Sequence, residues 1–95
     1  MPLTVVADIQ AAPGHEDLVG AELEGLVPLT RAEPGCARYD LHRDDQDPAH
    51  FLFYETWDSR EMWQAHRAAP HMAAFRAATE GKLARFAVHE MRQVA

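Results

Sequence analysis

The sequence predicts an α+β domain in which a four-stranded antiparallel sheet carries helices on one of its faces. Four segments alternate polar and apolar residues, as half-buried strands do, and they begin near positions 3, 36, 50 and 83. Segments with helical spacing of apolar residues follow the first and the third of these strands. The resulting order, β-α-β-β-α-β, is the ferredoxin-like plan.

The first strand is predicted over residues 3–10, where every second residue is apolar. A Pro-Gly pair at 13–14 then breaks the strand, and a helix is predicted over residues 15–32. Its apolar positions fall at helical spacing: Leu18, Val19, Leu23, Leu26 and Val27. Pro28 removes one amide donor, so we expect a kink in this helix.

The second and third strands are predicted over residues 36–43 and 50–57 and are joined by the polar loop 44–49. In the second strand, the alternation places Tyr39 on a different face from its two neighbours. Aromatic residues make the third strand the strongest of the four: Phe51, Phe53, Tyr54 and Trp57.

After the third strand, Ser59 is the expected N-cap of a short helix that ends near Arg67. Pro70 suits the first turn of another short helix, predicted over residues 71–80. The last strand is predicted over residues 83–94.

Length and composition limit the number of domains and the kinds of partner that the chain can have. Its 95 residues fit a single domain spanning residues 1–95, and its formal charge of −6 disfavours nucleic acid and anionic membranes as partners. The one cysteine, Cys36, cannot form an internal disulfide, and no apolar run is long enough to cross a bilayer. These features predict a cytoplasmic protein.

Four segments have a spacing typical of one family. They are Ala7-x-Ile9 with Pro13-Gly14, Arg31-x-Glu33-Pro34-Gly35-Cys36-x-x-Tyr39, Tyr54-Glu55-x-Trp57-x-Ser59-x-Glu61, and His66-x-x-x-Pro70-His71-x-x-x-Phe75. In this order they cover nearly the whole chain and resemble the antibiotic biosynthesis monooxygenase domain family. The nearest branch is that of the quinol monooxygenases, chiefly through Glu55-x-Trp57 and the run from Ala65-His66 to His71-Met72. The resemblance implies a dimeric ferredoxin-like α/β barrel.

The resemblance also implies a cofactor-independent monooxygenase that oxidises a quinol, an anthrone or a similar electron-rich aromatic with O2. In such an enzyme the ionised substrate supplies the electron, so the protein needs only a base and a dry pocket. Two alternatives stay open. One is an isomerase that transfers a proton on a small (phospho)sugar-derived signal, as in a branch that shares the His66 and His71 pattern. The other is a non-enzymatic dimer that binds small ligands.

His66 is the predicted catalytic base, because a neutral imidazole can take a proton from a phenol near neutral pH. Aromatic side chains suit a flat substrate because they stack on it. With a second histidine they make up the predicted substrate-binding set: Tyr54, Trp57, Trp63, His71 and Phe75. For each aromatic residue, packing in the core is the competing interpretation.

No cofactor and no metal are expected from the motifs. The six histidines include no H-x-x-x-H or H-E-x-x-H pair, and the five glycines form no phosphate-binding loop. A small aromatic substrate and O2 are the ligands that the family resemblance implies.

The predicted protein partner is a second copy of the chain. A small domain with Val6 on its open sheet face would expose apolar area as a monomer. Arg38, Asp40 and His42 would give this homodimer interface a mixed polar character.

Overall fold

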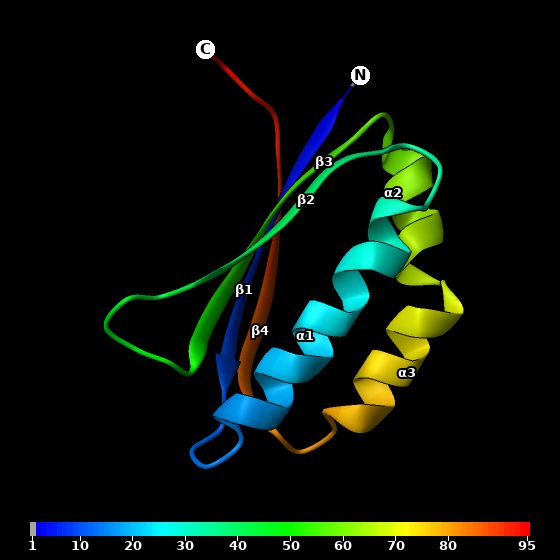
Figure 1. Cartoon of the computed structure of the whole chain (residues 1–95). Helices are drawn as coiled ribbons and strands as arrows, with labels where there is room; N and C mark the ends of the chain where they lie inside the picture. Colours follow the sequence, from blue (N-terminus) through cyan, green and yellow to red (C-terminus); the bar gives the residue numbers. More distant parts are fainter. Residues whose placement is uncertain (1) are drawn as a thin grey trace.

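The computed structural model describes residues 2–95, and its secondary structure follows the predicted order (Figure 1). The elements are β1 (Leu3–Ala11), α1 (Glu16–Arg31), β2 (Cys36–Arg43), β3 (His50–Trp57), α2 (Arg60–Arg67), α3 (Pro70–Ala78) and β4 (Leu83–Met91). The strands form one antiparallel sheet in the order β2-β3-β1-β4. All three helices lie on one side of this sheet. The ferredoxin-like α+β fold is confirmed.

The register of the sheet decides which side chains face the helices. Residues paired across neighbouring strands point to the same face. Val5 pairs with Glu55, and Glu55 pairs with Tyr39, so these three side chains form one row across β1, β3 and β2. All three are buried. A carboxyl group therefore lies in the middle of the helix-covered face.

Helix α1 covers this face with an apolar stripe that contains Val19, Leu23 and Leu26, all buried. The helix continues through Pro28 to Arg31, so the proline does not end it. The chain then turns at Gly35, which has a φ of +83°. A β-carbon at this glycine would collide with the side chain of Met62, so glycine is required both for the turn and for the close approach of α2.

The second half of the chain follows the prediction with shifts at the element ends. The Ser59 hydroxyl accepts a hydrogen bond from the Met62 amide at 3.2 Å, which confirms the predicted N-cap. Strand β4 ends at Met91 rather than Val94, because Met91 pairs with Thr4, next to the start of β1. Residues beyond this pair have almost no strand left beside them. No helix within residues 2–95 is long and apolar enough to span a membrane.

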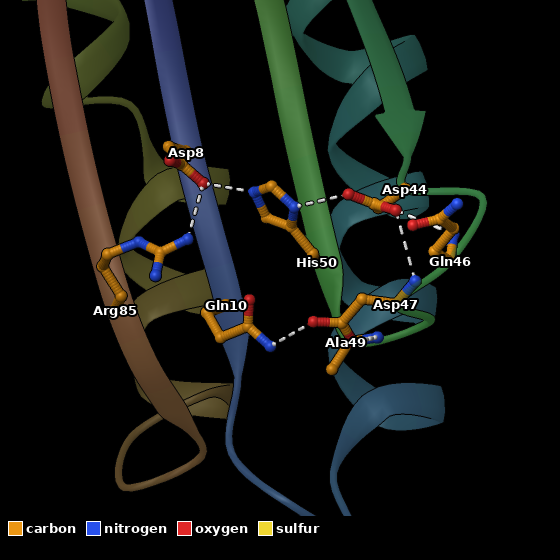
Figure 2. A network of polar contacts seen from close by, with 8 residues as sticks. All are labelled: Asp8, Gln10, Asp44, Gln46, Asp47, Ala49, His50 and Arg85. Carbon is orange, nitrogen blue, oxygen red and sulfur yellow. Dashed lines mark hydrogen bonds and ion pairs between the residues drawn. The ribbon is translucent and has the colours of Figure 1, made fainter.

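The sheet face opposite the helices carries a polar network (Figure 2). The His50 ring lies between two carboxylates, 3.1 Å from Asp44 and 2.7 Å from Asp8. Arg85 donates to the same Asp8 oxygen at 3.0 Å, so the network joins β1, β3 and β4 to the β2–β3 turn. The hydrogen bonds to Asp44 and Asp8 raise the pKa of His50 above its usual value.

Candidate active site

A cavity of about 580 Å³ lies between the sheet and the helices. Its walls are mostly apolar and include Val5, Leu26, Phe53, Trp63, Phe75 and Phe86. Val88 lines the cavity as well, and Phe86 and Val88 are each 43% exposed. The cavity therefore opens along the edge strand β4. A space of this size and character suits a small planar, largely apolar molecule.

His66 on α2 lines the cavity and is only 3% exposed. Its Nδ1 lies 2.7 Å from Oε2 of Glu33. A carboxylate accepts hydrogen bonds, so this contact assigns the ring proton to Nδ1 and leaves a lone pair on Nε2. Within residues 2–95, no fully buried side-chain nitrogen or oxygen lacks a hydrogen-bond partner. Nε2 of His66 has no such partner, so this atom is not fully buried. Nε2 is therefore exposed to the open space of the cavity.

Glu33 joins two histidines. Its Oε2 also lies 2.9 Å from Nε2 of His71, which is 3.3 Å from the Thr30 hydroxyl. The ligand atoms of Glu33, His66 and His71 all lie within 4.8 Å of one another, and two imidazoles with a carboxylate are ligands that transition metals use. Both nitrogens, however, are at hydrogen-bond distance from one oxygen, so we describe the group as two imidazole N–H donors on one carboxylate.

The surroundings of His66 favour its neutral form. Burial lowers its pKa below the usual value, and the hydrogen bond to Glu33 opposes this effect only in part. Its ring packs 4.9 Å from the Trp57 ring and 5.6 Å from the Tyr39 ring, measured between centroids. A neutral imidazole with a free Nε2 at an apolar cavity is the arrangement of a general base.

Glu55 is a second titratable group in the cavity, and it is 4% exposed. Its Oε1 accepts a hydrogen bond from Nε1 of Trp57 at 2.9 Å. Burial raises the pKa of Glu55 to about 7, against the hydrogen bond from Trp57, and the charge of Glu33 adds to the rise. A carboxyl with such a pKa holds or releases a proton near neutral pH.

Glu33 and Glu55 are site residues that the sequence motifs did not predict. A signal for Glu55 was present, because strand alternation places it on the same face as Phe53 and Trp57. For Glu33 no local pattern exists, since its partner His66 lies 33 residues further along the chain.

The structure brings three of the predicted site residues to the cavity: His66, Trp63 and Phe75. The predicted substrate-binding residue His71 instead contacts Glu33, behind His66. His71 and His66 thus share one oxygen of the Glu33 carboxylate.

The other two predicted aromatic residues are placed differently. Trp57 is fully buried, where it packs on His66 and donates to Glu55. Tyr54 lies on the opposite face of the sheet, 38% exposed, with the Arg38 guanidinium 5.1 Å from its ring centroid. Because Tyr54 alternates with buried Phe53 and Glu55, the strand cannot present it to the same cavity.

Comparisons with known proteins agree with this fold. The family model described as antibiotic biosynthesis monooxygenase matches residues 2–78. "Probable quinol monooxygenase YgiN" of Escherichia coli (strain K12) is 32% identical over 89 residues, covering 83% of this chain and 86% of that protein. The crystal structure of PA3566 from Pseudomonas aeruginosa superposes with a TM-score of 0.95 at 36% identity, covering 99% of this chain and 95% of that one. Rv0793 from Mycobacterium tuberculosis has a TM-score of 0.91 at 29% identity, with coverages of 100% and 97%.

Proposed function

Because this chain belongs to the antibiotic biosynthesis monooxygenase family, we propose that it oxidises a quinol, an anthrone or a similar electron-rich aromatic with O2, without a cofactor. The observation that carries the proposal is a buried imidazole at an apolar cavity: His66, whose Nδ1 is held by Glu33 and whose Nε2 is free. The name of the relative YgiN supports the quinol as the substrate class.

The proposed first step is ionisation of the substrate. A planar ring enters between the aromatic walls, Trp63 and Phe75 among them, and Nε2 of His66 takes the phenolic proton. The Glu33 carboxylate stabilises the imidazolium that forms and keeps the ring oriented. The phenolate then gives an electron to O2, and the apolar walls keep water from the reactive intermediates.

Oxygen consumption with a panel of hydroquinones tests this function. We expect uptake by the purified protein in the presence of a metal chelator, because the proposal needs no metal. The His66→Ala variant should lose about 10²–10⁴-fold in kcat/KM, the usual size of a general-base contribution. His15→Ala, which removes a histidine outside the cavity, is the matched control and should keep the activity.

Two results would contradict the proposal. One is an absence of oxygen uptake across the panel, and proton exchange into an enolisable sugar phosphate without O2 would then favour the isomerase. The other is an active His66→Ala variant with unchanged kcat/KM, which would remove the base from the mechanism.

We also propose that the chain acts as a cytoplasmic homodimer formed through the open sheet face. Tyr54 and Arg38 stack on this face, and Val6 lies beside them in the sheet. Light scattering should give twice the chain mass of 10.7 kDa. A monomer at micromolar concentration would refute the dimer.

A further inference from the structure

We infer that Glu55 is the proton donor of the reaction and that it decides whether oxygen enters the product. This inference rests on the proposed monooxygenase function. Glu55 is the second titratable group of the cavity, and the ionisation step by His66 does not use it.

The Glu55 carboxyl presents one of its oxygens to the cavity. Its Oε1 is occupied by the Trp57 indole N–H at 2.9 Å, which fixes the plane of the group. Its Oε2 has no hydrogen-bond partner in the protein. Within residues 2–95 no fully buried side-chain oxygen or nitrogen lacks such a partner, so Oε2 is not fully buried. Oε2 must therefore reach the cavity that Glu55 lines, where it can contact a bound molecule.

Glu55 and His66 line the same cavity from different elements. Glu55 belongs to the sheet wall of the cavity and His66 to the helix wall. Trp57 connects them, since its ring packs 4.9 Å from the His66 ring while its Nε1 holds Glu55. A substrate in the cavity can therefore contact a base from the helix wall and an acid from the sheet wall.

His66 and Glu55 differ in their protonation states near neutral pH. Burial lowers the pKa of His66 and raises that of Glu55 to about 7, so near pH 7 the imidazole is neutral while a large fraction of the carboxyl keeps its proton. Cys36 and Tyr39 on β2 and Glu33 before it interact with the charge of Glu55. The other charged or titratable groups that line the same cavity are His66 and Arg67 on α2, Arg76 on α3, and Glu80 after it. Of these, Glu33 adds to the raised pKa of Glu55 by its charge.

The proposed reaction needs a proton donor after the C–O bond has formed. His66 takes the phenolic proton, the phenolate transfers one electron to O2, and the radical pair joins to form a C–O bond at a neighbouring ring carbon. The product is a peroxide anion, and the Glu55 proton converts it into the hydroperoxide. The Glu55 carboxylate then removes the proton from that carbon, the O–O bond breaks, and the departing hydroxide takes the proton from the His66 imidazolium. Quinol plus O2 gives hydroxyquinone plus water, and both side chains return to their starting states.

Without the Glu55 proton, the peroxide has another outcome. The C–O bond breaks again while the second phenolic hydroxyl loses its proton, so the substrate leaves as the plain quinone. This proton and the proton on the His66 imidazolium convert the departing peroxide into hydrogen peroxide. This reaction also balances, because quinol plus O2 gives quinone plus H2O2. The ratio of the two products is therefore a readout of Glu55 that a change in folding or in substrate affinity would not produce.

The test compares wild type with Glu55→Gln, which keeps the size of the side chain and an oxygen for the Trp57 hydrogen bond. Glu24→Gln is the matched control, since it makes the same chemical change on the exposed surface of α1. With ¹⁸O2 and a quinol that wild type oxidises, we expect one labelled oxygen in the wild-type and Glu24→Gln products. Glu55→Gln should lose about 10²–10⁴-fold in kcat/KM for oxygenation and release H2O2 instead. For wild type we expect a fall in kcat/KM above about pH 7, where Glu55 loses its proton, and Glu55→Gln should lack this fall.

The outcomes separate this inference from the function on which it rests. If wild type incorporates label and Glu55→Gln does so at the same rate and ratio, the donor role is refuted and the monooxygenase function stands. If wild type oxidises no quinol, both are refuted. Trp57→Phe gives a second, independent check: loss of its hydrogen bond should move the alkaline limb to higher pH, and an unmoved limb would contradict the assignment to Glu55.

Discussion

The buried carboxyl of Glu55 makes a prediction about stability that needs no substrate. In the folded chain its pKa is about 7 instead of the usual 4.5, and each pKa unit corresponds to about 1.4 kcal/mol. Ionising Glu55 therefore costs the folded state about 3 kcal/mol relative to the unfolded chain. Because the pKa is raised on folding, the associated stability is fully present below about pH 4.5 and is lost as the pH rises through about 7.

The substitution Glu55→Gln removes this ionisation and keeps the side-chain volume. The variant should gain about 3 kcal/mol in free energy of unfolding relative to wild type between about pH 4.5 and about pH 8.5. Urea unfolding, followed by tryptophan fluorescence at one protein concentration, measures the difference at each pH. The exposed Glu24→Gln control should show no such trend. A wild-type-minus-variant difference that stays constant over this range would refute the reasoning.

Three further predictions concern the neighbouring groups. Glu33→Gln should lower kcat/KM for quinol oxidation by about 10²–10⁴-fold, because an amide no longer stabilises the protonated His66; unchanged kinetics would count against the pair. Gly35→Ala should lower the free energy of unfolding by about 2–5 kcal/mol in urea, since it adds a clash with Met62 to a φ of +83°, and a smaller loss would mean that α2 can move away. In an NMR titration, His50 should show a pKa above 6.5 and His66 one below it, and the reverse order would contradict both environments.

Predictions from local periodicity succeeded wherever the cause was local. The strand over residues 36–43 and the strand over 50–57 were predicted with their observed bounds, because alternation and turn residues mark both ends. The last strand was predicted three residues too long. Its end depends on the length of β1, with which it pairs, and nothing within residues 83–94 carries that information.

The candidate site was likewise predicted only where its features depend on the local sequence. The sequence by itself determined the fold class, and it singled out His66 as a titratable residue beside an aromatic strand. Tyr54 was grouped with the substrate-binding residues on its aromatic character, although alternation along residues 50–57 places it on the face opposite Phe53 and Glu55.

Only the tertiary structure decided what surrounds His66. Glu33 reaches His66 and His71 across separations of 33 and 38 residues, once α2 and α3 lie beside α1 on the same face of the sheet. The proton affinity of Glu55 likewise depends on burial under the helices and on one indole N–H. Periodicity acts within a strand or a helix, whereas hydrogen bonding and desolvation act through space, so the chemistry of this cavity exists only after the helices have packed on the sheet.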